Sequence, residues 1–112
     1  MTEPTRDQVD ALPGPTLLEF GASWCGYCQA AQPLIAKVMA ELPHVRHFMV
    51  EDGKGKRLGR SFGVKLWPTL VFMLDGSEVA RIVRPGTVEE IRRAMAKIAT
   101  PHREAVISAR IG

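Results

Sequence analysis

Short apolar runs with the length of buried strands recur along the chain, each bounded by turn-forming residues. They cover residues 16–20, 45–50 and 69–74. Asp75-Gly76, after the third run, is a hairpin signal, so residues 78–83 are expected to return antiparallel to that run. The pattern therefore predicts four strands, of which the first is interrupted by a single acid, Glu19.

Helical periodicity fills the segments between the apolar runs. The longest helical pattern covers residues 25–42, where Pro33 should kink the helix. Thr5 and Thr87 each stand three residues before a Gln or a Glu, which is the capping-box pattern, and they predict a first helix and a last helix. A loop and a short basic helix are expected in residues 53–61.

This order of elements predicts an α/β fold with a mixed central sheet flanked by helices on both faces. We expect parallel strands joined by crossover helices, then an antiparallel hairpin and a covering helix. At 112 residues the chain is long enough for one domain, because ordinary domains have roughly 100–150 residues.

Composition changes this prediction little. The chain is 46% hydrophobic and 24% charged, like an average soluble globular protein, which argues against a disordered or low-complexity class. No apolar run approaches the roughly 20 residues of a membrane span, and the polar, acidic start is unlike a secretory signal. We therefore expect no membrane partner and a cytoplasmic location.

The net charge of +3 is far from the clustered excess of a nucleic-acid binder, and no nucleic-acid partner is expected. Basic residues concentrate at one place only: Lys54, Lys56, Arg57, Arg60 and Lys65. A solvated helix face is the main interpretation of this cluster. Electrostatic steering of an acidic protein partner is the alternative.

The two cysteines, Cys25 and Cys28, are too few for a disulfide scaffold and stand where a strand gives way to a helix. Unpaired backbone N–H groups at a helix start favour negative charge, so Cys25 should be held partly as the nucleophilic thiolate. Cys28, one turn further on, is placed to attack a mixed disulfide formed by Cys25, which leaves a 25–28 bridge. The pair therefore predicts a two-electron thiol–disulfide exchanger.

A Cys-x-x-Cys motif also occurs in metal sites and as buried structural thiols. A closed zinc site needs four ligands, and the remaining candidates, His44, His47 and His102, are not at paired spacing. We therefore expect no metal.

Two further residues draw attention. Glu19 in a buried strand would carry a large desolvation cost and suit a proton acceptor, although it could instead face solvent at a sheet edge. Pro68 begins the third strand after Trp67. It could adopt the cis form and leave the preceding backbone free to pair with an extended peptide, or be an ordinary trans strand-entry proline.

Several motifs occur together and in one order: Trp24-Cys25-Gly26-Tyr27-Cys28, Pro33, Trp67-Pro68-Thr69-Leu70 and Asp75-Gly76. With them the chain resembles the thioredoxin family over about residues 16–99. The resemblance implies a thioredoxin fold in a single domain of residues 1–112, with 100–112 as a C-terminal extension that forms a docking helix, an added strand or a loose tail. It also implies a protein thiol–disulfide oxidoreductase that reduces protein disulfides and needs no cofactor. Such an enzyme would act in cell redox homeostasis and electron transport.

The resemblance assigns roles to individual residues. Cys25 matches the attacking cysteine and Cys28 the resolving, more buried one, while Glu19 takes the position of a buried acid, normally aspartate, that helps to deprotonate the second cysteine. Pro68 matches a cis-proline facing the cysteines. The residues expected to bind the substrate are Trp24, Gly26, Tyr27, Trp67 and Pro68.

The departures from the family pattern qualify this interpretation. Tyr27 replaces the usual proline, which gives a Cys-Gly-Tyr-Cys motif like that of periplasmic disulfide isomerases and leaves the direction of electron flow open. Trp67 stands where a small or β-branched residue is common. The lysine usually near the buried acid has no match, because Phe48 lies about there, and the N-terminal segment is too short for the family's first edge strand.

Two alternatives to a disulfide reductase stay open. One is a non-catalytic binding module of the same fold that holds a partner through Trp24, Trp67 and Pro68, and the other is an enzyme working as an oxidant or isomerase. For the reductase we expect protein disulfide substrates, a recycling reductase and a monomeric state.

Overall fold

A four-stranded mixed sheet forms the centre of the molecule. The computed structural model describes residues 3–111 and the side chains of residues 3–99. The strands, in spatial order β2-β1-β3-β4, are β1 (Pro15–Gly21), β2 (Arg46–Glu51), β3 (Thr69–Leu74) and β4 (Ser77–Val83). The four strands predicted from the apolar runs are all present, and the fold is the expected α/β class.

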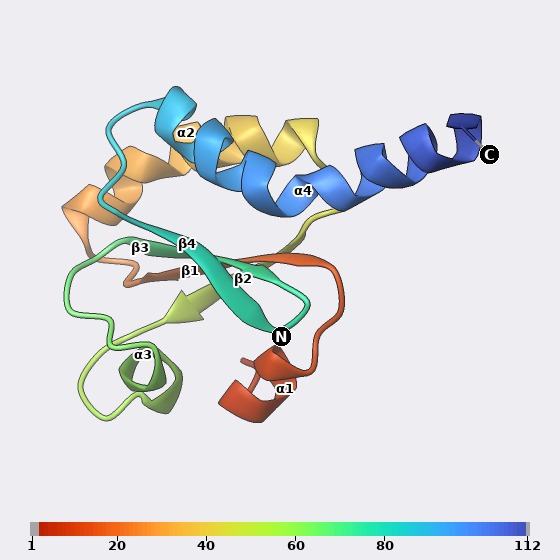
Figure 1. Cartoon of the computed structure of the whole chain (residues 1–112). Helices are drawn as coiled ribbons and strands as arrows, with labels where there is room; N and C mark the ends of the chain where they lie inside the picture. Colours follow the sequence, from red (N-terminus) through yellow and green to blue (C-terminus); the bar gives the residue numbers. More distant parts are fainter. Residues whose placement is uncertain (1–2, 112) are drawn as a thin grey trace.

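Helices cover both faces of this sheet (Figure 1). They are α1 (Arg6–Asp10), α2 (Gly26–Glu41), α3 (Arg57–Ser61) and α4 (Val88–Ile111). Neighbouring residues of β1 point to opposite faces, so Leu17 packs with Ile35 and Met95 of α2 and α4, while Leu18 packs with Val9 and Phe62 on the side of α1 and α3. Because both faces are covered, the two central strands β1 and β3 are the most deeply buried, and β1 positions the residues that follow it.

One expectation about the sheet is wrong. β2 runs parallel to β1, but β3 runs antiparallel to it, so only the first pair has a parallel crossover. The helix in the second connection, α3, has five residues and rises only about 7.5 Å, whereas a six-residue strand is about 20 Å long. The chain therefore stays at the end of the sheet where β2 stops, and β3 starts from there in the opposite direction.

The two ends of the chain differ from the family pattern. Within residues 3–111 no strand precedes β1, and the short capped helix α1 occupies this part of the chain. This agrees with the expectation that the family's first edge strand is absent. At the other end, the backbone of α4 continues as a helix to Ile111 and runs past the sheet (Figure 1), so this part of the extension is not an added strand. The side chains of residues 100–112, and with them any docking role, lie outside the described residues.

None of the helices in the described part of the chain combines the length and the apolar character that crossing a bilayer requires.

Candidate active site

The junction between β1 and α2 positions Cys25. β1 ends at Gly21, a short turn follows, and α2 begins at Gly26, so Cys25 is the N-cap of the helix and not its first residue. Its sulfur accepts a hydrogen bond from the backbone N–H of Cys28 at 3.1 Å. A serine or aspartate N-cap makes the same contact, and here the hydrogen bond stabilises negative charge on sulfur.

The surroundings of the two cysteines separate their acidities. Burial acts to raise the pKa of Cys25, but hydrogen bonds from the side chain and backbone of Cys28 and from the backbone of Tyr27, together with the charge of Arg84, outweigh it and leave the pKa below the ordinary thiol value. Burial raises the pKa of Cys28 to about 11, and its hydrogen bond to Cys25 adds to this rise. Cys25 is thus the better nucleophile near neutral pH, while Cys28 stays protonated.

Exposure does not distinguish the two cysteines. Each exposes 7% of its surface, whereas the family resemblance implied a more buried Cys28. Gly21 makes the close packing of Cys28 possible, because a Cβ atom at Gly21 would lie only 2.7 Å from the Cys28 sulfur. Burial acts to raise the pKa of both thiols, and only at Cys25 do the hydrogen bonds and the charge of Arg84 outweigh it.

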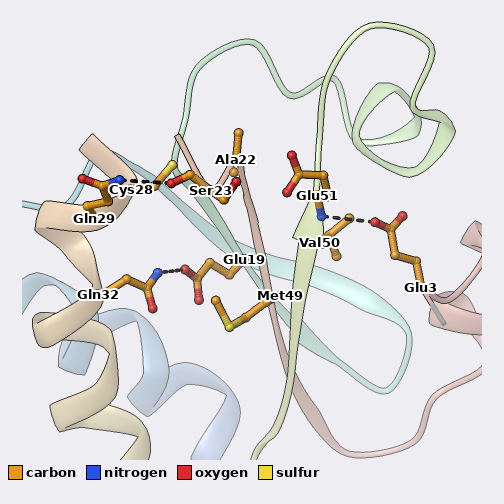
Figure 2. Close-up of a pocket in the computed structure, with 11 residues that line it drawn as sticks. Glu3, Glu19, Ala22, Ser23, Cys28, Gln29, Gln32, Met49, Val50 and Glu51 are labelled. Atoms are coloured by element: carbon orange, nitrogen blue, oxygen red, sulfur yellow. Dashed lines mark hydrogen bonds between the residues drawn. The ribbon is translucent and has the colours of Figure 1, made fainter. Parts of the chain in front are cut away.

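Glu19 is buried, with 4% of its surface exposed, so the solvent-facing alternative is excluded. One carboxylate oxygen accepts a hydrogen bond from the Gln32 side chain, and the other lies 2.9 Å from Nε2 of His47. Glu19, Gln32 and Cys28 line one cavity of about 400 Å³ (Figure 2). This arrangement places a carboxylate in the same cavity as the protonated second thiol.

Sequence reasoning missed both partners of Glu19. His47 stands one position before Phe48, where a lysine was sought, and it reaches Glu19 because β2 runs beside β1. Arg46 and Glu51 of the same strand are also polar, so the local pattern of β2 did not single out His47.

Aromatic residues surround the cysteines on the exposed side. The ring of Trp67 packs against the cluster of Ala22, Cys25 and Cys28, and meets Trp24 edge-on with ring centroids 5.3 Å apart. The Trp67–Pro68 peptide is cis, and Pro68 is buried.

The remaining predicted substrate-binding residues lie at the start of α2. Trp24 and Tyr27 are 73% and 60% exposed, and Gly26 is also exposed. The structure therefore brings the predicted site residues to one end of the sheet.

Two charged residues that the sequence did not suggest hold Trp67 in place. Its indole N–H donates to Oδ2 of Asp52 at 2.9 Å, and its carbonyl accepts a hydrogen bond from Nε of Arg84 at 2.8 Å. The Arg84 guanidinium also lies 3.8 Å from the centre of the Tyr27 ring. Asp52 could have been found from its position directly after β2, since β1 and β2 are parallel and end together, but nothing local pointed to Arg84.

Within the described part of the chain, no three His, Cys, Asp or Glu residues gather where they could hold a metal ion. His47 instead faces Glu19. What the site offers chemically is a pair of thiols, of which one is acidic, beside a buried carboxylate.

Comparison with known proteins supports the same interpretation. The sequence model of the thioredoxin family matches residues 4–97. Thioredoxin H-type 1 of Nicotiana tabacum is 35% identical over 85 residues, which cover 76% of this chain and 67% of the relative. The thioredoxin of Chlamydia pneumoniae is 37% identical over 70 residues, which cover 62% of this chain and 69% of the relative. The solved structure of thioredoxin 2 from Pseudomonas aeruginosa PAO1 in its reduced form superposes with a TM-score of 0.79 at 57% identity, covering 88% of this chain and 92% of that one.

Proposed function

Because the chain belongs to the thioredoxin family and is a thiol–disulfide oxidoreductase that reduces protein disulfides, we propose that Cys25 and Cys28 are the dithiol that carries this reaction. The observation that supports this assignment best is the Cys25 sulfur at the N-cap of α2, where it accepts the hydrogen bond of the Cys28 N–H. Only a thiolate attacks a disulfide efficiently, and this contact favours the thiolate.

In the first step the Cys25 thiolate attacks one sulfur of the substrate disulfide. The substrate S–S bond breaks, a mixed disulfide forms between Cys25 and the substrate, and the other substrate sulfur leaves as a thiolate that takes up a proton. The exposed rings of Trp24 and Tyr27, with Gly26, Trp67 and Pro68, form the surface that would receive the substrate chain around its disulfide.

In the second step Cys28 resolves the mixed disulfide. Its proton passes to Glu19 across the cavity that both side chains line, directly or through one water molecule. The resulting thiolate attacks the sulfur of Cys25, so that the second substrate thiolate is released and a 25–28 disulfide remains. Two electrons have then moved from the protein to the substrate, and His47 and Gln32 hold the Glu19 carboxylate in position.

Thioredoxins act on protein disulfides and are returned to the dithiol form by reductases. We propose the same cycle here, in a chain that works as one domain and as a monomer. A compartment that keeps thiols reduced, such as the cytoplasm, suits a dithiol that serves as an electron donor.

Cysteine variants test the assignment. The wild-type protein should accelerate the reduction of insulin disulfides by dithiothreitol, and Cys25→Ser and Cys28→Ser should both lose this effect. Cys28→Ser should in addition accumulate a covalent mixed disulfide, while Cys25→Ser should not. Equal capture of substrate by both variants would contradict the assigned order of attack.

The reduction potential of the 25–28 bridge, measured by equilibration with glutathione buffers, checks the direction of electron flow. A value among the strongly reducing dithiols supports the reductase, and a value among the oxidants favours the isomerase suggested by the Cys-Gly-Tyr-Cys motif.

A further inference from the structure

The positive charge of the chain is concentrated in one short segment. Residues 53–65 contain no acid and hold five cations: Lys54, Lys56, Arg57, Arg60 and Lys65. The whole chain has fifteen Lys and Arg against twelve acids; without these five cations, ten remain against the same twelve, a net charge of −2. The mild overall charge of +3 therefore conceals a strongly uneven distribution.

The fold gathers four of these cations around one hollow beside α3, which we call the cationic hollow. It has a volume of about 250 Å³ and is lined by Lys54, Lys56, Arg60 and Lys65. Within residues 3–99 none of the four forms an ion pair. Two loops and a helix contribute them, so the arrangement is more than the single solvated helix face that the sequence predicted.

Among the described residues, Asp52 is the one acid that lines the hollow, and its carboxylate already has partners. Oδ2 accepts the indole N–H of Trp67, and Oδ1 lies against Gly59 of α3, where any Cβ atom would collide with it. The Asp52 carboxylate is thus held against Trp67. It forms no ion pair with the four cations, which remain available to an anionic group of another molecule.

The cationic hollow lies next to the active site. Asp52 joins it to Trp67, whose ring packs against the cysteine cluster. The carbonyl of Trp67 is held by Arg84, which has no ion-pair partner in the described part of the chain. A protein chain bound over Trp67 would therefore meet the charge of Arg84 as well as that of the hollow.

We propose that the cationic hollow docks an acidic segment of the protein disulfide substrate while the substrate disulfide lies at Cys25. This inference rests on the proposed function and specifies its substrate class: proteins with a cluster of Asp or Glu near the disulfide. Charge complementarity supports it, because opposite charges beside a reactive site raise the rate of encounter. None of the described residues that line the hollow has an aromatic side chain on which a nucleic-acid base could stack, which favours a protein segment.

Three peptide disulfides test the proposal, identical except for a flank of four Glu, four Lys or four Ser residues. We expect the wild-type protein to reduce the Glu-flanked peptide with a kcat/KM about tenfold above that of the Ser-flanked peptide at low salt. The preference should disappear in 0.5 M NaCl.

Matched charge reversals locate the effect. Lys56→Glu/Arg60→Glu should abolish or invert the preference for the Glu flank, and Lys56→Ala/Arg60→Ala should give an intermediate ratio. Arg93→Glu/Lys97→Glu changes the net charge equally but on α4, across the sheet from α3 (Figure 1), and should keep the wild-type ratio. Circular dichroism confirms that each variant is folded.

The possible outcomes are distinct. If no peptide is reduced, the proposed function fails, whereas equal reduction of the three peptides, or loss of the preference in the α4 variant, overturns the docking proposal alone. If Lys56→Glu/Arg60→Glu keeps the wild-type preference, the effect does not arise in the hollow and the docking proposal is again overturned.

Discussion

Replacing Glu19 by glutamine should slow the second step of the reaction and leave the first step unchanged. The substitution Glu19→Gln removes the buried negative charge but keeps the size of the side chain and oxygen and nitrogen atoms that can pair with Gln32 and His47. The variant should therefore fold, and the change in rate reports on proton transfer.

The magnitude follows from the acidity of Cys28. Burial raises the pKa of that thiol to about 11, so at pH 7 only about one molecule in ten thousand carries a free thiolate there. A positioned proton acceptor contributes typically 10²- to 10⁴-fold to such a step. The charge of Glu19 also raises the Cys28 pKa, and its loss offsets part of the effect, but burial is the largest cause and remains. We therefore expect resolution to slow by about 10²-fold.

Rapid-quench measurements of a single turnover separate the two steps. Reduced protein is mixed with a peptide disulfide, free thiols are alkylated at set times, and the mixed disulfide is quantified by mass spectrometry. In Glu19→Gln the mixed disulfide should accumulate, and its decay should accelerate about tenfold per pH unit up to near pH 11, since the thiolate fraction rises in this way below the pKa of Cys28. The wild-type decay should depend less on pH.

Glu51→Gln is the matched control for this experiment. Glu51 lines the same cavity as Glu19 but is exposed, and Gln32 and His47 direct their hydrogen bonds to Glu19. Its substitution should leave the decay of the mixed disulfide at the wild-type rate. If Glu19→Gln resolves the mixed disulfide as fast as the wild type with the same pH profile, Glu19 is not the proton acceptor and the reasoning is refuted.

Three further predictions concern the same site. Because the pKa of Cys25 is lowered, iodoacetamide should modify this residue below the pH at which an ordinary thiol reacts. Cys28, with a pKa of about 11, should be modified only in strong alkali, and peptide mapping would distinguish the two sites. Arg84→Ala should raise the pKa of Cys25 and slow its alkylation at pH 7; an unchanged rate would mean that the charge has no influence. Gly21→Ala should lower the free energy of unfolding by about 1–3 kcal/mol in urea titrations because its Cβ meets the Cys28 sulfur, whereas Gly26→Ala, with open space around it, should cost nothing.

Local sequence patterns were sufficient for the strands, the helices and the cysteine pair. A spacing of three fits one helical turn, so Cys25 and Cys28 could be placed together without any tertiary information. Glu19 could be identified because an acid in an apolar run is costly. These conclusions depend on neighbours in the chain, which a sequence displays directly.

Contacts between distant segments could not be predicted in this way. His47 meets Glu19 because two strands lie side by side, and Arg84 reaches Trp67 and Tyr27 from the turn after β4. The direction of β3 was wrong for a related reason: it depends on where the chain emerges after α3 and not on the composition of the strand. Such features depend on how the elements are arranged in three dimensions.

The outer edge of β2 has a consequence for how the protein behaves in concentrated solution. β2 is the outermost strand on one side of the sheet, and in the described residues no strand pairs with the edge that faces away from β1. An open edge is a template on which a second chain can add a strand and begin aggregation. At Glu51 the carboxylate of Glu3 accepts the backbone N–H at 3.1 Å. A single acidic side chain thus occupies an amide that an intruding strand would need, and it brings a negative charge that repels acidic chains.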